Sequence, residues 1–153
     1  MAKLTRRQVR DNAFQIIFEK LLRDDPIEVL YDISGEIEDF TLTDDVKKLI
    51  EGVLEHSEEI DERIASFSKK RALSRIPKVN LAILRIAFYE ILYDDKTPTN
   101  AAINEAVLMS QAYAYKEDTS FVNGVLSSFS KSLEMKEEGT VMERETEENQ
   151  EDA

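Results

Sequence analysis

Cysteine is absent from this 153-residue chain, and glycine and proline are rare, at four and three residues. Without cysteine there is no disulfide framework, no thiolate metal site and no cysteine nucleophile. So few glycines and prolines leave little turn chemistry for a sheet of many strands. Apolar residues recur instead at helical spacing, which favours an all-α fold.

The chain also lacks an apolar run that could cross a bilayer, which takes about 20 residues. Its longest apolar stretch, residues 79–93, has the sequence VNLAILRIAFYEILY and is interrupted by Asn80, Arg85 and Glu90. The apolar residues cover every side of a helix, which is typical of the central helix of a helical domain. A charge on such a helix needs a partner, so we expect Arg85 to pair with Glu90 or Glu105.

Apolar spacing predicts about seven helices in two packed halves of three to four helices each, within one domain at residues 1–135. The halves divide between residues 70 and 74, and the central helix covers residues 74–93 with Pro77 in its first turn. Gly52 within the third helix indicates a close helix crossing. The expected helix caps are Thr5 with Gln8 as a capping box, then Asp25, Thr43 and Thr99.

Net charge is −12, but the charge is unevenly distributed. Residues 134–153 hold nine acidic and two basic residues, and we predict a disordered acidic tail at residues 136–153. Two short windows gather positive charge, and such clustering is what makes an electrostatic footprint. The first contains Lys3, Arg6, Arg7 and Arg10, and the second contains Lys69, Lys70, Arg71, Arg75 and Lys78.

Arg6, Arg7 and Arg10 lie on the first two turns of the first helix, where cations oppose the helix dipole at a cost of up to about 1 kcal/mol. Accepting that cost suggests a use such as phosphate binding, although a solvated basic terminus is the alternative. The second window, taken alone, is more typical of a solvated loop. Folded beside the first, it would form a groove for a polyanion.

No residue set predicts an enzyme, a cofactor or a metal site. The chain has no glycine-rich phosphate loop and no histidine or acidic set with the spacing of metal ligands. The single histidine, His56, precedes Ser57 at a helix end that we expect on the surface. The first residues carry charge without a secretory apolar core, which predicts a cytoplasmic protein without membrane association.

Several blocks, in this order and spacing, resemble the NusB family of bacterial transcription antitermination factors over about residues 5–130. The blocks are Arg6-Arg7 with Arg10, Ala13-Phe14-Gln15, Ile17-Phe18, Leu73-Ser74-Arg75, Ile83 to Ala87 with Tyr89-Glu90, Pro98, Ile103 to Val107, and Phe121 to Leu126. The resemblance implies an all-α fold and a function without catalysis. It implies pairing with the ribosomal protein NusE, binding of the boxA RNA of ribosomal RNA leaders, and help for RNA polymerase in resisting termination.

By position, the resemblance assigns roles to single residues. Arg6, Arg7 and Arg10 would contact RNA phosphates, Arg75 and Lys78 would flank the same groove, and Phe18 would contact NusE. Arg85, Glu90, Asn104, Glu105, Asn123 and Gly124 would be structural, through ion pairs, caps, buried hydrogen bonds and a close helix crossing. Some members of the family self-associate, so a homodimer is a further expectation.

The chain departs from the family pattern at several positions. Arg71 replaces a common tryptophan, which adds charge and removes a packing anchor, and Gln111 replaces a common lysine, which weakens an expected RNA contact. The link at residues 118–121 is one residue short. Two alternatives follow: a protein scaffold of the same complex without RNA binding, and an appendage of a ribosomal RNA cytosine methyltransferase, which the lack of cysteine disfavours.

Overall fold

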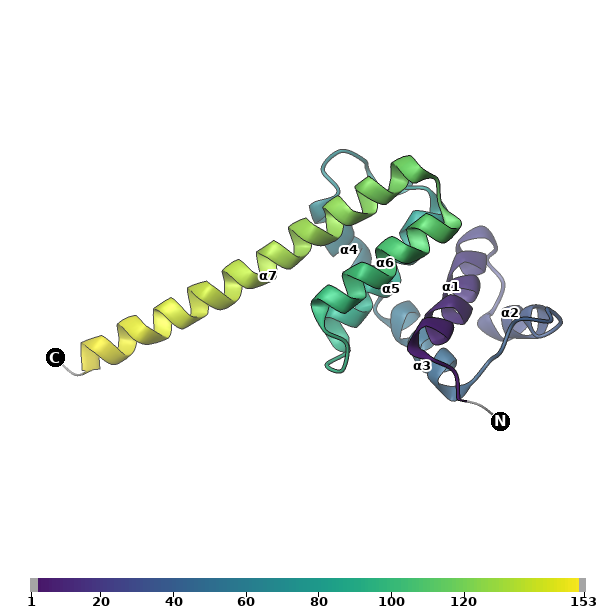
Figure 1. Cartoon of the computed structure of the whole chain (residues 1–153), viewed down its shortest axis with the longest axis horizontal. Coiled ribbons are helices and arrows are strands. Elements are labelled where there is room, and N and C mark those ends of the chain that lie inside the picture. Colours follow the sequence, from purple (N-terminus) through teal and green to yellow (C-terminus); the bar gives the residue numbers. More distant parts are fainter. Residues whose placement is uncertain (1–2, 152–153) are drawn as a thin grey trace.

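The computed structural model describes the backbone of residues 3–151 and the side chains of residues 3–136. Within that range the chain forms seven α-helices and one short 3₁₀ turn, with no strand, so the all-α prediction is confirmed (Figure 1). The elements are α1 (Arg6–Leu22), α2 (Ile27–Ser34), α3 (Asp44–Glu55), α4 (Ser57–Phe67), η1 (Leu73–Arg75), α5 (Lys78–Tyr93), α6 (Thr99–Tyr113) and α7 (Lys116–Glu151).

Helix α5 is the centre of the fold, as its apolar sequence predicts. It packs against α1, α3, α4, α6 and α7, and one hydrophobic core includes buried residues from all of these helices. The short connector after α5 turns the chain so that α6 runs back along α5 (Figure 1). None of the described helices is long and apolar enough to span a membrane. The division of the domain near residues 70–74 stays a prediction.

The start of α5 differs from the prediction. Helix α5 begins at Lys78 rather than near residue 74, because η1 occupies Leu73–Arg75 and Ile76 is extended, with φ −73° and ψ 126°. A proline disfavours the helical conformation in the residue before it, so Pro77 keeps Ile76 extended. Pro77 is therefore the N-cap of α5 and not part of its first turn.

The predicted caps are confirmed at two of four places. Thr5 and Gln8 form a complete capping box before α1, and the Thr43 hydroxyl accepts a hydrogen bond from the Val46 backbone N–H at 3.2 Å. Asp25 and Thr99 are not caps. Pro26 and Pro98 occupy the N-cap positions of α2 and α6, and neither helix has a side-chain cap there.

Gly52 lies where α3 crosses α5, as predicted. A Cβ atom at Gly52 would overlap the ring and hydroxyl of Tyr89 on α5. Gly124 gives the opposite result, because a Cβ atom there would meet no atom within 4 Å. The prediction that Gly124 allows a close helix crossing is wrong.

Helix α7 continues past Met135, where apolar spacing ends, and runs to Glu151 (Figure 1). Glutamate, lysine, arginine and methionine all have high helix propensity, and no proline interrupts residues 116–151. The predicted disordered tail at 136–153 falls almost entirely on residues whose side chains lie outside the described part of the chain. The disorder of this tail stays a prediction. The expectation that the last helix ends near Met135 is wrong, because α7 continues to Glu151.

Candidate functional site

The arginines of α1 meet the carboxyl-terminal end of α5. Arg10 donates from Nε and Nη2 to the two carboxylate oxygens of Glu90, at 2.7 and 2.8 Å. The side chains of Arg10 and Glu90 are only 8% and 3% exposed. Burial alone would lower the pKa of Arg10, but the hydrogen bonds and negative charge of Glu90 raise it above its ordinary value. Arg10 is thus a buried link between α1 and α5.

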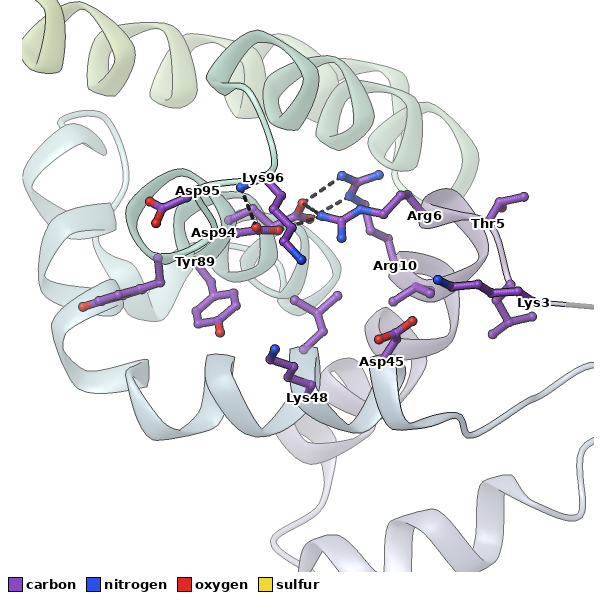
Figure 2. A pocket seen from close by; sticks show the side chains of 15 residues that line it. Lys3, Thr5, Arg6, Arg10, Asp45, Lys48, Tyr89, Asp94, Asp95 and Lys96 are labelled. Carbon is purple, nitrogen blue, oxygen red and sulfur yellow. Dashed lines mark hydrogen bonds and ion pairs between the residues drawn. The ribbon is translucent and has the colours of Figure 1, made fainter.

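Arg6 is tied to the connector that follows α5. Its Nη2 donates to Asp94 Oδ2 at 2.7 Å and to the Thr97 hydroxyl. Partial burial acts to raise the pKa of Asp94, yet the hydrogen bonds from Arg6 and Thr97 hold it below the ordinary value. Figure 2 shows this network at the back of a pocket between α1, α3 and the end of α5.

Arg7 pairs with α6. It donates from Nε and Nη2 to the Glu105 carboxylate at 3.1 and 3.0 Å. The hydrogen bond from Arg7 lowers the pKa of Glu105. Each arginine of the predicted phosphate site therefore has an acidic partner within the protein. The side chains of Arg6 and Arg7 remain 59% and 63% exposed, but the prediction of Arg10 as a phosphate contact is wrong because its guanidinium is buried.

The second basic window remains open. Lys69, Lys70, Arg75 and Lys78 are exposed and form no ion pair with any described residue. Arg71 alone is engaged: its Nη1 lies 3.2 Å from Asp118 Oδ1, and its guanidinium lies over the Phe121 ring at 4.6 Å. The sequence suggested that arginine at this position removes a packing anchor. The structure shows instead that Arg71 fastens the α4–α5 connector to α7.

The two basic windows do not form one groove. Arg6 and Arg10 contact the carboxyl-terminal end of α5 and its connector, whereas Arg75 precedes α5 and Lys78 is its first residue. A helix of 16 residues separates these ends by about 24 Å, at about 1.5 Å per residue. The predicted joint groove is wrong because α5 is inserted between its two sides.

Gln111 lies near the end of α6 and is exposed. Because α6 runs back along α5, this end of α6 returns toward the start of α5. Tyr115 follows with 80% of its surface exposed, and Lys116 is exposed as well. Neither was singled out from the sequence, although an aromatic residue in a short polar link was a usable signal. We call Lys69, Lys70, Arg75, Lys78, Gln111, Tyr115 and Lys116 the open basic end.

The other predicted residues take varied positions. Arg85 donates to both carboxylate oxygens of Asp61 on α4, at 2.9 and 2.7 Å, so the expected pairing with Glu90 or Glu105 is wrong. Asn104 and Asn123 are exposed, so their predicted buried hydrogen bonds are wrong too. Phe18 is half-buried, and its ring stacks on Phe14 with centroids 5.8 Å apart.

The fold and these surfaces define a helical protein with a cationic end, and no described group of acidic and histidine residues could hold a metal ion. The family model described as "NusB family" matches residues 7–131. The chain belongs to the NusB family of transcription antitermination proteins. This membership confirms the prediction of a non-enzymatic protein.

Individual relatives agree. A transcription antitermination protein NusB of Acetivibrio thermocellus is 38% identical over 138 residues, covering 88% of this chain and 94% of the relative. One from Oceanobacillus iheyensis is 35% identical over 124 residues, covering 81% and 97%. Among solved structures, T. maritima NusB superimposes with a TM-score of 0.75 at 28% identity, over 85% of this chain and 93% of that one. A structure of antitermination factors NusB and NusE with double-stranded RNA gives 0.73 at 27% identity, over 83% and 96%.

Proposed function

We propose that this chain is an RNA-binding adaptor in transcription antitermination. In this role it binds boxA-type RNA of nascent ribosomal RNA transcripts together with NusE and helps RNA polymerase resist termination in the cytoplasm. The structural relative in complex with NusE and RNA supports both partners. The observation that carries the proposal is the open basic end, where four cations of the second window form no ion pair with a described acidic residue.

The two basic windows have unequal roles in this proposal. Arg75 and Lys78 bind phosphates directly, because no described carboxylate competes for them. Gln111 donates one hydrogen bond beside them, and Tyr115 offers an exposed ring on which an unpaired base can stack. Arg6 and Arg7 are secondary contacts, since RNA must compete with Asp94 and Glu105 for them. Arg10 acts indirectly by fixing α1 to α5.

Contact with NusE is assigned to the aromatic face of α1. Phe18 lies next to Phe14, whose ring stacks on Tyr113 with centroids 4.7 Å apart. Leu22 continues this row of α1 at a spacing of four residues and is 55% exposed. The same face is the proposed contact of a homodimer, so the two assemblies would exclude each other.

The test is fluorescence anisotropy of a labelled boxA RNA against the protein premixed with NusE, from low to physiological salt. For single strands, the slope of log affinity against log salt becomes shallower by about 0.7 for each phosphate that the protein no longer neutralises. We expect the Arg75→Gln, Lys78→Gln variant to lose about 1.4 from the slope. The matched control is Arg63→Gln, Lys131→Gln, which removes the same charge from solvent-accessible positions elsewhere and should leave the slope unchanged.

A scaffold without RNA binding is the second candidate. It is favoured by the internal neutralisation of all three α1 arginines. If the pair with NusE forms and binds RNA no more tightly than NusE alone, the adaptor proposal fails and the scaffold remains. If binding survives in the Arg75, Lys78 variant and is lost in an Arg6→Gln, Arg7→Gln variant, the RNA site lies at the other end of α5.

A further inference from the structure

A pocket of about 720 Å³ lies at the carboxyl-terminal end of α5, away from the open basic end. Its walls come from the segment before α1, from α1 itself, from α3, and from the end of α5 with its connector (Figure 2). This volume is in the range of pockets that hold small molecules. Of its lining residues, only Arg6 and Arg10 have a role in the function proposed above.

Three lysines from separate elements line this pocket: Lys3 before α1, Lys48 on α3 and Lys96 in the α5–α6 connector. Their amino groups form no ion pair with any described residue. In Figure 2, Lys96 comes from the connector and Lys48 from α3 on the opposite side, and both amino groups reach the space between them. By contrast, Arg6 and Arg10 at the back are already paired with acidic residues.

Aromatic and acidic side chains line the rest of the pocket. Tyr89 and Tyr93 form an aromatic wall, and the Tyr93 ring is held by His56, with centroids 4.0 Å apart. Two further carboxylates, Asp45 and Asp95, also line the pocket and are exposed without an ion pair to a described residue. Unpaired amino groups suit a phosphate, carboxylates suit sugar hydroxyls, and aromatic rings suit the flat face of a base.

We infer that this pocket binds one nucleotide unit, with its phosphate on Lys48 and Lys96 and Lys3 closing over it. The unit has two sources: a free mononucleotide, or a nucleotide of a bound RNA strand. The RNA source rests on the proposed function, whereas the mononucleotide source is independent of it. A phosphate chain without sugars is disfavoured, because it offers no hydroxyl groups to Asp45 and Asp95 and its charge would be repelled by them.

The test is a titration of the ¹⁵N-labelled full-length protein, followed by amide chemical shifts. One arm uses adenosine 5′-monophosphate, and the other uses a six-nucleotide single-stranded RNA. We expect saturable shifts at Lys48, Tyr93 and Lys96. In a Lys48→Gln, Lys96→Gln variant the dissociation constant should rise about ten-fold or more, because both charge-assisted contacts to the phosphate are lost.

The matched control is Arg23→Gln, Lys131→Gln, which removes the same charge from exposed positions outside both the pocket and the open basic end and should leave the pocket shifts unchanged. Pocket shifts with the mononucleotide identify a free ligand, and pocket shifts with RNA alone identify a strand. Either result supports the site, even if anisotropy shows no boxA binding. Absence of shifts in both arms up to millimolar ligand, or shifts that persist in the Lys48, Lys96 variant, would overturn it. All four substitutions lie on exposed side chains, and an unchanged melting temperature verifies folding.

Discussion

Replacing Glu90 by glutamine tests how the first turns of α1 are fixed to the centre of the molecule. The carboxylate accepts two hydrogen bonds from Arg10, at 2.7 and 2.8 Å. Glutamine keeps the shape but leaves a buried guanidinium without its counter-charge. Breaking a buried ion pair by removing one partner costs about 3–5 kcal/mol. Asp94 and Glu105 also stabilise the Arg10 charge, so we expect the lower bound, about 3 kcal/mol.

The assay is urea unfolding followed by circular dichroism, with a thermal scan. For a chain of this size, a loss of about 3 kcal/mol corresponds to a melting temperature lower by about 6–12 °C. Arg23→Gln is the control, because its ion pair with Asp25 is largely exposed and should contribute less than about 1 kcal/mol. A double change of Arg10 and Glu90 to methionine should recover much of the stability, since a buried pair is often replaceable by apolar residues. A loss below about 1 kcal/mol for Glu90→Gln would refute the reasoning.

Two further predictions concern the same region. Gly52→Ala should destabilise the protein by about 1–3 kcal/mol, because the new methyl group overlaps Tyr89. In urea unfolding, the loss of stability in a Gly52→Ala, Tyr89→Leu double variant should be smaller than the sum of the two single losses. Strictly additive losses would contradict the close contact between Gly52 and Tyr89. Lowering the pH should weaken folding through Asp94 and Glu105, whose pKa values lie below their ordinary values in the folded state. Their contribution is present above the unfolded pKa and is lost as the pH falls through the folded pKa. Urea midpoints measured down to about pH 3 should fall less steeply in an Arg6→Gln, Arg7→Gln variant, and parallel curves would exclude these pairs as the cause.

The fold could be predicted because its determinants are local or periodic. Apolar residues on every side of residues 79–93 predict a central helix, and the buried residues of α5 agree. The helix boundaries were harder to predict from the sequence. The cap at Thr5 needs only residues three positions apart, whereas the start of α5 depends on how Pro77 restricts Ile76 after a 3₁₀ turn. Gly52 could be singled out, but only the packed structure shows that Tyr89 is what it accommodates.

The site could be predicted only in part, because charge clustering does not reveal pairing between distant segments. Two basic windows are visible in the sequence, but the acidic partners of Arg6 and Arg7 lie 88 and 98 residues further along the chain. From the sequence, Arg85 is expected to pair with a glutamate. Its partner in the structure is Asp61 on α4, which lies 24 residues earlier in the chain. Both errors come from tertiary contacts, which residue spacing along one helix does not encode.

The pairing of the α1 arginines has a consequence for how the molecule distributes its charge. A chain with net charge −12 has few cations to present, and three of those in α1 are used to join α1 to α5, its connector and α6. Among the described residues, most cations without an ion pair then lie at the two ends of α5: the open basic end, and the pocket with Lys3, Lys48 and Lys96. Since about 24 Å separates these ends, one RNA phosphate cannot reach both. Loss of binding at one end therefore need not disturb the other, and the Arg75, Lys78 variant and the Lys48, Lys96 variant should act independently.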